Sequence, residues 1–303
     1  MFQKIKRYLK DPYFALGCDM IRKCPQLMSD SFYIKTQWRI NMDYPLNLRN
    51  PQTFCEKLQW LKLNDHNPLY HKLVDKYEVK NWVSEKIGER YVVKNYALYN
   101  SVDEIDFHVL PKQFVLKCTH NSGGLVVCTD KDNLNIDDTK RLLQENLDVH
   151  DYYDRNREWA YKGVKPRIIA EEYIDSLGKP ESIEYKITCI QGKVKMITVC
   201  SGIAHVEYDK RFNDHFDREG NRLPFYVNYK PAGLNLPEKK YMDEMIRISE
   251  CLSAGIPQVR VDLYIHNNQI YFGEMTFYTW AGYMHYEPKE WDGIMGSWLS
   301  LPE

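Results

Sequence analysis

Apolar residues recur every three or four positions in two stretches of the first 90 residues, which is the spacing of one face of an α-helix. The first is CEKLQWLKL at 55–63, and the second is YHKLVDKYEVKNWVSEKIG at 70–88, which we interpret as one helix ending at its terminal glycine. Thr53 precedes the first stretch, and Glu56 follows three residues later, which predicts a capping box. We therefore expect residues 1–95 to form a mostly helical N-terminal region.

Short apolar and β-branched runs follow and predict strands, with helical spacing between some of them. The predicted helices are 135–153 and 238–255. In chain order, the predicted strand runs are RYVVKNYALY (90–99), FVLKCTH (114–120), GLVVCTD (124–130), RIIAEEYI (167–174), IEYKITCIQGKVKMITVCSG (183–202) and QVRVDLYIHNNQIYFGEMTFY (258–278). The last two strand runs are interrupted by QG and HNNQ, so we expect two hairpins. Strands and helices interleave, but hairpins dominate the strands, so the pattern predicts an α+β or a mixed α/β fold, of which we expect α+β.

Composition limits the classes of partner and compartment. The 41 basic and 42 acidic residues of the 303-residue chain nearly cancel, so we expect no nucleic-acid partner. Eight cysteines form no CxxC, which suggests reduced thiols and a cytoplasmic protein. No run of about 18 apolar residues suits a membrane span. The basic, amphipathic N-terminus leaves two interpretations: a solvated surface helix, or peripheral contact with the inner face of a membrane.

One candidate site is the stretch FVLKCTHNSGG at 114–124, where an apolar run ends in a lysine and continues into a serine and two glycines. These residues are Lys117, Ser122, Gly123 and Gly124. A loop with so little side chain lets backbone N–H groups approach an anion, and an adjacent cation suits a polyphosphate. The lysine precedes the glycines, so this is not a P-loop. A lysine at a strand end can also be a solvated edge residue.

A second candidate is the hairpin VRVDLYIHNNQIYFGEMTFYTWAG, in which four polar residues interrupt apolar or aromatic runs. They are Arg260, Asp262, Glu274 and Thr276. If the turn centres on Asn268, Asp262 lies directly across from Glu274. Two opposed carboxylates are costly to bury without a cation between them, and Mg²⁺ prefers such oxygen ligands. The alternative is a wet sheet face on which each carboxylate pairs with a lysine.

The strand IIAEEYI at 168–174 ends in paired glutamates and is open to two interpretations. Its backbone can form the edge that binds an adenine. It can equally be an edge strand protected by charge.

Taken together and in order, these stretches resemble the ATP-grasp superfamily. The resemblance is carried by VDKYEVK (74–80), FVLKCTHNSGG, IIAEEYI, EYKITCIQGKV (184–194) and VRVDLYIHNNQIYFGEMTF. NPQTFCEKLQWLKLNDHNP, LVDKYEVKNWVSEKIGERYVV and SVDEIDFHVLPKQFVLKCTHNSGG resemble the TupA-like branch, named for teichuronopeptide biosynthesis. The resemblance implies an ATP-grasp fold after the helical region, with a glycine-loop lobe at 96–174 and a magnesium lobe at 175–303 that together hold ATP.

The resemblance also implies roles for individual residues. Lys76 and Lys117 correspond to the lysines that contact the nucleotide phosphates, and Ser122, Gly123 and Gly124 correspond to the loop that closes over them.

Further roles concern the nucleoside. Glu171, Glu172, Tyr173 and Ile174 correspond to the hinge that holds adenine, through its backbone and its first side chain. Glu184 corresponds to the acid that holds the ribose.

The metal and phosphoryl roles fall on the hairpin. Asp262 and Glu274 correspond to the magnesium ligands, and Arg260 to the arginine near the transferred phosphoryl group. The superfamily usually has asparagine where this chain has Thr276, whose hydroxyl is a weaker metal ligand. The stretch 207–221 has no firm counterpart, and we predict from it that Lys210 and Arg211 contact the substrate or the γ-phosphate.

The reaction implied is the ATP-dependent joining of a carboxylate and an amine through an acyl phosphate. The TupA-like resemblance suggests an amino acid and a uronic acid of a cell-surface or capsular polysaccharide. The alternative is a glycosyltransferase, for which DKD at 130–132 has the DxD form that holds a metal and a nucleotide sugar. A third interpretation is a binding protein that has lost its catalytic activity.

Overall fold

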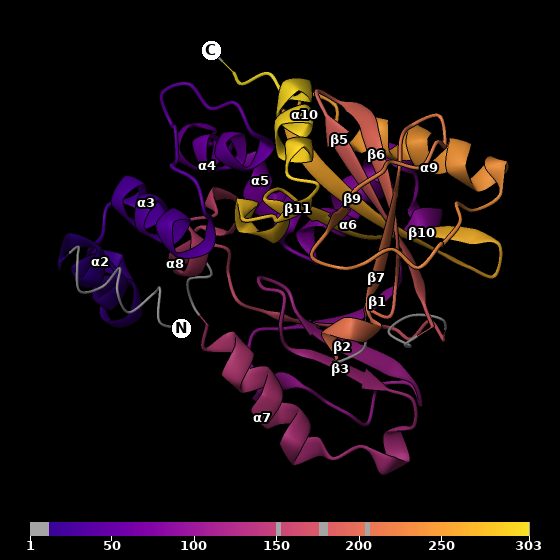
Figure 1. Cartoon of the computed structure of the whole chain (residues 1–303). Helices are drawn as coiled ribbons and strands as arrows, with labels where there is room; N and C mark the ends of the chain where they lie inside the picture. Colours follow the sequence, from indigo (N-terminus) through magenta and orange to yellow (C-terminus); the bar gives the residue numbers. More distant parts are fainter. Residues whose placement is uncertain (1–11, 150–152, 176–180, 204–206, 303) are drawn as a thin grey trace.

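The structure is a computed structural model that describes residues 12–149, 153–175, 181–203 and 207–302 (Figure 1). The basic stretch at 1–11, on which both interpretations of the N-terminus depend, lies outside these residues. Within them, no helix has the length and apolar character needed to cross a membrane.

Helices fill the N-terminal region, as expected. They are α2 (Pro12–Lys23), α3 (Asp30–Asn41), α4 (Phe54–Asn64), α5 (Leu69–Val74) and α6 (Glu78–Ile87). The predicted capping box is confirmed: Thr53 accepts from the Glu56 N–H, and the Glu56 carboxylate accepts from the Thr53 N–H. Gly88, at φ 111°, ends α6, because a left-handed conformation suits glycine.

The single long helix predicted across α5 and α6 is wrong. Asp75 interrupts it, because its Oδ1 accepts hydrogen bonds from the N–H groups of Tyr77 (2.8 Å) and Glu78 (2.9 Å) and so starts a new helix. The N–H of Lys76 donates out of the helix to the carbonyl of Thr119 at 3.0 Å. The break therefore docks Lys76 against the loop that follows the first candidate strand.

Sheet A is a four-stranded antiparallel sheet in the order β1-β4-β2-β3. Its strands are β1 (Asn95–Tyr99), β2 (Phe114–Cys118), β3 (Leu125–Cys128) and β4 (Ile168–Glu172). Helix α7 (Ile136–Leu147) packs on it through Leu143 and Leu147, which join Phe114 and Leu116 in one core cluster. In Figure 1, β2, β3 and α7 form the lower layer of the molecule. The helix predicted at 135–153 thus ends earlier, and α8 (Tyr153–Asn156) follows separately.

Sheet B is a five-stranded antiparallel sheet in the order β10-β9-β5-β6-β7 and forms the upper layer in Figure 1. Its strands are β5 (Ile183–Ile190), β6 (Lys193–Ser201), β7 (Phe212–Phe216), β9 (Gln258–His266) and β10 (Gln269–Thr276). Both expected hairpins form, because Gln191-Gly192 and Asn267-Asn268 adopt the positive φ angles of tight turns. Helix α9 (Lys239–Leu252) packs on the apolar face of the sheet.

The C-terminal segment is more structured than the sequence pattern predicted. It contains α10 (Glu290–Trp298) and β11 (Tyr286–Glu287), which pairs with β8 (Tyr226–Val227). Helix α10 packs closely on the start of α4: a Cβ on Gly296 would lie 2.1 Å from the Gln52 carbonyl oxygen. The short 3-10 segments are Pro25–Leu27, Glu89–Tyr91, Val102–Glu104, Lys131–Asn133, Trp159–Tyr161, Tyr208–Lys210 and Thr279–Gly282. The α+β prediction is confirmed by this arrangement.

Candidate active site

A row of five polar side chains crosses the face of sheet B opposite α9. Directly paired residues of an antiparallel ladder point to the same face of the sheet. The pairs run from β10 to β7 as Glu274 with Asp262, Asp262 with Lys186, Lys186 with Thr198, and Thr198 with His215. The neighbouring pair of Thr276 and Arg260 lies beside the β10 end of this row.

The opposition of Asp262 and Glu274 is present, as predicted, but its geometry is different. The turn is the two residues Asn267-Asn268, which alone would place Gly273 across from Asp262. A bulge between Phe272 and Glu274 adds one residue to β10 and restores the pairing. A Cβ on Gly273 would lie 3.1 Å from the Asp262 carbonyl oxygen, so glycine suits this bulge.

The protein itself supplies the cations that Asp262 requires. Arg260 binds its carboxylate with two nitrogens, at 2.6 and 2.7 Å, and the Lys186 Nζ lies 2.9 Å from Oδ2. Burial raises the pKa of Asp262, but Arg260 and Lys186 outweigh it and hold the pKa below its ordinary value. Asp262 is therefore ionised, and Arg260 and Lys186 balance its negative charge.

Glu274 is the more accessible carboxylate, with 46% of its side chain exposed. Its Oε1 accepts from the Thr276 hydroxyl at 3.2 Å and lies 3.5 Å from an Arg260 nitrogen. Asp262, Glu274 and Thr276 together offer oxygen donors only, and Mg²⁺ typically takes one or two carboxylates and completes its shell with phosphates and water. This donor set fits magnesium, although the described residues contain no cluster of three His, Cys, Asp or Glu side chains suited to a metal.

Lys186 is a site residue that the sequence analysis missed. Besides Asp262, its Nζ contacts Glu184 at 2.9 Å, so it joins the predicted ribose acid to the predicted metal ligand. Burial lowers the pKa of Lys186, but Asp262 and Glu184 outweigh this effect and raise the pKa. The signal available was the two-residue spacing from Glu184, which places both side chains on one face of the strand.

In sheet A, Glu171 is held between two lysines. Its carboxylate oxygens lie 2.6 Å from Lys117 and 2.6 Å from Lys80, and the residue is only 3% exposed. Burial raises the pKa of Glu171, but the two lysines outweigh it and lower the pKa to about 2. The first hinge side chain therefore already binds a predicted phosphate lysine.

Lys80 is a second residue that the sequence analysis missed. It also donates to the Val93 carbonyl at 2.9 Å, and burial lowers its pKa to about 8 despite Glu171. On the sequence it is one more lysine of an amphipathic helix, so only its burial distinguishes it.

Lys76 contacts the loop after β2 of sheet A and is also influenced electrostatically by Glu274 of sheet B. Its Nζ donates to the carbonyl oxygens of Asn121 and, at 3.3 Å, of Cys118. Burial lowers the pKa of Lys76, Glu274 of sheet B opposes this, and Lys117 of sheet A adds to it. The predicted phosphate lysines and the predicted metal ligand therefore share one electrostatic environment.

The glycine loop is tightly packed in this structure. Gly124 has φ 63°, and a Cβ there would lie 2.5 Å from the Cys118 sulfur and 2.9 Å from the Asn146 Cβ. The Gly123 N–H donates to the Asn121 side chain at 3.0 Å, while Ser122 is exposed. Packing and backbone conformation thus account for both glycines, and the anion-binding role of the loop stays a prediction.

Among the remaining hinge residues, Ile174 contacts sheet B and the other two are more exposed. Glu172 is exposed, and the Tyr173 hydroxyl donates to Asp175 at 3.0 Å. Ile174 is buried in a small cluster with Val93 and Tyr264, the latter from sheet B.

Lys210 and Arg211 lie just before β7 rather than in the polar row. Lys210 is exposed and pairs with Glu207 at 3.3 Å. The Arg211 guanidinium stacks over Tyr208 and donates to the Tyr229 hydroxyl at 3.2 Å. Their contact with substrate stays a prediction.

The DKD pattern has a structural explanation. The Asp130 side chain caps a 3-10 turn and accepts from Asn133 at 2.7 Å. Asp130 and Asp132 both lie near Lys112, at 3.7 and 3.8 Å. The pattern therefore forms a local cap at the end of sheet A.

Comparison with known proteins decides the family. The TupA-like ATPgrasp family matches residues 56–300 of this chain. The chain belongs to the TupA-like ATP-grasp family. The match confirms the family resemblance and the fold expected from the sequence, and it agrees with the expected class of ATP-grasp ligase. No curated protein matches the chain.

Several solved structures are partly similar to the TupA-like chain. D-alanine–D-alanine ligase from Bacillus anthracis complexed with ATP has 15% identity and a TM-score of 0.38, over 68% of this chain and 55% of that chain. The D-cycloserine synthetase DcsG has 13% identity and a TM-score of 0.41, over 69% and 64%. The N5-carboxyaminoimidazole ribonucleotide synthetase purK, in its ADP complex, has 15% identity and a TM-score of 0.42, over 82% and 58%. The chain thus spans between half and two thirds of the length of these structures.

Proposed function

We propose that this protein is an ATP-dependent carboxylate–amine ligase that acts through an acyl phosphate. We further propose that it joins an amino acid to a uronic acid of a cell-surface or capsular polysaccharide or its precursor. The observation that carries the ligase proposal is the position of Lys76 between the two sheets. Burial lowers the pKa of Lys76, Glu274 of sheet B raises it, and Lys117 of sheet A lowers it. A triphosphate needs such a combination of cations from one side and metal-binding oxygens from the other.

The reaction has two balanced steps. A substrate carboxylate oxygen attacks the γ-phosphorus of ATP, the bond to the β,γ-bridging oxygen breaks, and ADP leaves. The amine then attacks the acyl carbon, inorganic phosphate leaves with the bonding pair, and the amine loses a proton.

The residues of the chain act by alignment and charge compensation. Lys76 and Lys117 bind the phosphates, and Arg260 stabilises the oxyanion that forms on the acyl carbon. Asp262, Glu274 and Thr276 would hold magnesium, which when bound neutralises phosphate charge. Losing one preorganised donor such as Arg260 typically raises the barrier by roughly 2.7 to 4 kcal/mol.

Isotope transfer provides the test. The protein is incubated with ATP, Mg²⁺, an amino-acid pool and D-glucuronate labelled with ¹⁸O in its carboxylate, and the released phosphate is measured by mass spectrometry. We expect phosphate release that requires both substrates, and one ¹⁸O atom in each phosphate. Phosphate without label would contradict the acyl phosphate, and turnover of a nucleotide sugar without ATP would replace the ligase with a glycosyltransferase.

A further inference from the structure

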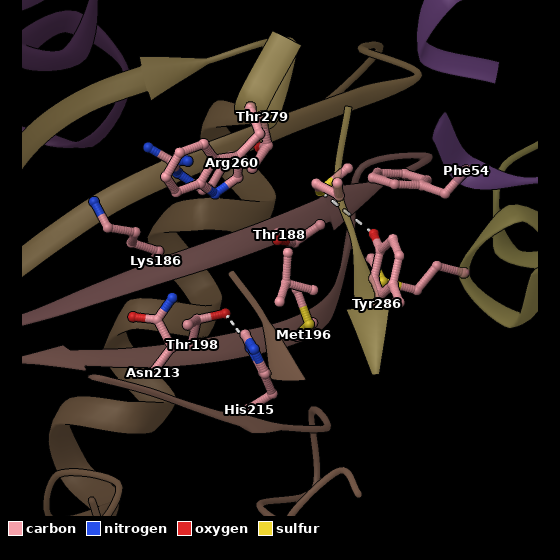
Figure 2. A pocket seen from close by; sticks show the side chains of 14 residues that line it. Phe54, Lys186, Thr188, Met196, Thr198, Asn213, His215, Arg260, Thr279 and Tyr286 are labelled. Atoms are coloured by element: carbon pink, nitrogen blue, oxygen red, sulfur yellow. Dashed lines mark hydrogen bonds between the residues drawn. The ribbon is translucent and has the colours of Figure 1, made fainter. Parts of the chain in front are cut away.

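A cavity lies on the polar face of sheet B, where the row of polar side chains continues past Lys186 and Arg260 toward β7 (Figure 2). Its lining includes Thr198, Asn213 and His215 at the β6 and β7 end. The cavity volume is about 50 Å³. Since a water needs roughly 10 to 15 Å³ by the same measure, this space suits a few hydroxyl-sized groups rather than a whole sugar or amino acid.

Two buried polar atoms of the cavity lining have no hydrogen-bond partner among the described residues. They are the His215 Nε2 and the Asn213 Oδ1, in residues that are 4% and 8% exposed. Buried polar atoms are almost always satisfied, because desolvation without a partner is costly. A ligand atom in the cavity would satisfy both.

The imidazole of His215 is held in a fixed orientation. Its Nδ1 lies 2.9 Å from the Thr198 hydroxyl, which Figure 2 shows as a dashed line. Its ring stacks on Phe225 at 4.6 Å between centroids, with an interplanar angle of 4°. Both contacts leave Nε2 as the atom available to a ligand.

The β6 and β7 end of the cavity is uncharged. No described residue that lines the cavity is Asp or Glu, and the cations Lys186 and Arg260 are already paired with acids. Asp214, next to His215 in the chain, accepts instead from the N–H groups of Ala232 and Leu234. Burial lowers the pKa of His215 to about 4, so the ring is neutral at pH 7. An ammonium or a second carboxylate would be buried here without a counter-charge, whereas a hydroxyl both donates and accepts.

The spacing of the strands sets the size of the ligand. Thr198 lies one strand beyond Lys186, and His215 lies two strands beyond it. Neighbouring strands are about 4.8 Å apart, so the hydroxyl position is roughly 5 to 10 Å from a carboxylate bound at Lys186 and Arg260. This is the span of a six-membered ring.

An aromatic side chain flanks the outer part of the cavity. Trp280 lines the cavity and is also 40% exposed, so it lies where the cavity meets solvent. Trp280 and Ala281 have φ 51° and 52°, a strained conformation for residues other than glycine. Helix α4 holds this turn, because Gln59 (3.0 Å) and Lys62 (2.7 Å) donate to the Ala281 carbonyl.

We propose that His215 and Asn213 determine the specificity for the acyl donor by binding the hydroxyl groups of its sugar ring. This inference rests on the proposed function, which places the reacting carboxylate beside Arg260. It excludes a free α-amino acid as the acyl donor and assigns the amino acid to the amine side of the reaction.

Binding of matched acids tests the proposal without turnover. Calorimetry with the Mg²⁺–AMPPNP-loaded protein compares D-glucuronate, D-galacturonate and D-mannuronate with cyclohexanecarboxylate, a ring carboxylate without hydroxyls. We expect at least one uronate to bind at least tenfold more tightly than cyclohexanecarboxylate. Equal or weaker binding of all three uronates would overturn the proposal.

Variants of His215 separate recognition from structure. His215→Asn keeps a nitrogen near Thr198 and removes Nε2, whereas His215→Gln places a nitrogen near the Nε2 position. We expect His215→Asn and Asn213→Ala to abolish the preference for the uronate and to leave AMPPNP affinity unchanged. We expect His215→Gln to restore part of the preference and His71→Asn, in a histidine outside the cavity lining, to retain all of it.

The outcomes distinguish this inference from the proposed function. An unchanged uronate preference in folded His215→Asn would overturn the specificity role. If the wild-type protein prefers uronates in the binding experiment but releases no phosphate in the turnover assay, the ligase proposal is contradicted. The hydroxyl subsite is then still supported.

Discussion

At the scale of single residues, the buried charges of the site are compensated within the protein before any ligand arrives. Glu171 has two lysines, and Asp262 has Arg260 and Lys186. A buried charge without a partner costs several kcal/mol, whereas one partner of two can be lost with less effect. Lys117, which is predicted to bind phosphate, can therefore be removed without unfolding the protein.

Lys117→Met tests this argument. We expect the dissociation constant for Mg²⁺–ATP to rise at least tenfold, because the predicted contact of Lys117 with the phosphates is lost. The free energy of unfolding should fall by about 1.5 to 3 kcal/mol, the typical contribution of a hydrogen bond to a charged group, and the protein should stay folded because Glu171 keeps Lys80. Calorimetry and urea unfolding measure the two quantities. Lys112→Met, an exposed lysine of the same region, is the control, and unchanged ATP affinity in Lys117→Met would remove Lys117 from the site.

The acid dependence of stability should report on Glu171. Its pKa falls from 4.5 to about 2 on folding, so its contribution is fully present above pH 4.5 and is lost as the pH falls toward 2. We expect the stability difference between wild type and Glu171→Gln to shrink across this window, by on the order of 3 kcal/mol in total. Urea unfolding at a series of pH values measures it. A difference independent of pH would show that Glu171 is not held ionised by its lysines.

At the scale of elements, the sequence predicted the caps and turns that are determined by residues close together in the chain. The capping box at Thr53 and the turn at Gln191-Gly192 are set within a few positions of the chain and were predictable. The break at Asp75 was not, because its apolar spacing is helical on both sides and the contact of Lys76 with Thr119 is distant in sequence. His215 was missed for the same reason, since only the register of sheet B aligns it with Thr198 and Lys186.

Substitutions at Asp75 test whether the helix break positions Lys76. Asp75→Ala removes the cap of α6 and the ion pair with Arg167, whereas Asp75→Asn retains a capping oxygen and loses the charge. We expect Asp75→Ala to cost about 1 kcal/mol or more in stability and to weaken ATP binding. Asp75→Asn should bind ATP more tightly than Asp75→Ala. Equal ATP affinities in the two variants would show that the cap does not position Lys76.

The glycine loop can be tested with a matched pair of glycines. Gly124 and Gly163 have similar φ angles, 63° and 69°, but only Gly124 has atoms within 4 Å of an added Cβ. Gly163→Ala should therefore lose stability through backbone strain only, on the order of 1 kcal/mol. Gly124→Ala should lose stability through the same strain and through a steric clash. We expect Gly124→Ala to have the larger loss in thermal stability. Equal losses would mean that the loop is not packed against Cys118 and Asn146.

At the scale of the whole molecule, two features link the described parts of the two sheets. One is the apolar cluster of Val93, Ile174 and Tyr264, and the other is the environment of Lys76. The apolar contact fixes how the sheets are placed, and the charged contact faces the predicted nucleotide. A triphosphate bound there would couple residues that belong to different sheets and do not pair with each other.

A double-mutant cycle measures this coupling. Lys117→Met and Glu274→Gln each remove one predicted contribution to Mg²⁺–ATP binding. Either change would let the triphosphate shift in the site, so the second change would then reduce the affinity by less. We expect the sum of the single effects on ATP affinity to exceed the effect of the double variant by at least 0.5 kcal/mol. The same cycle for unfolding without nucleotide should be additive within about 0.5 kcal/mol, because the two side chains belong to different sheets. Lys112→Met with Glu219→Gln, both exposed, is the control cycle. Additive effects on ATP affinity would mean that Lys117 and Glu274 do not bind the same triphosphate.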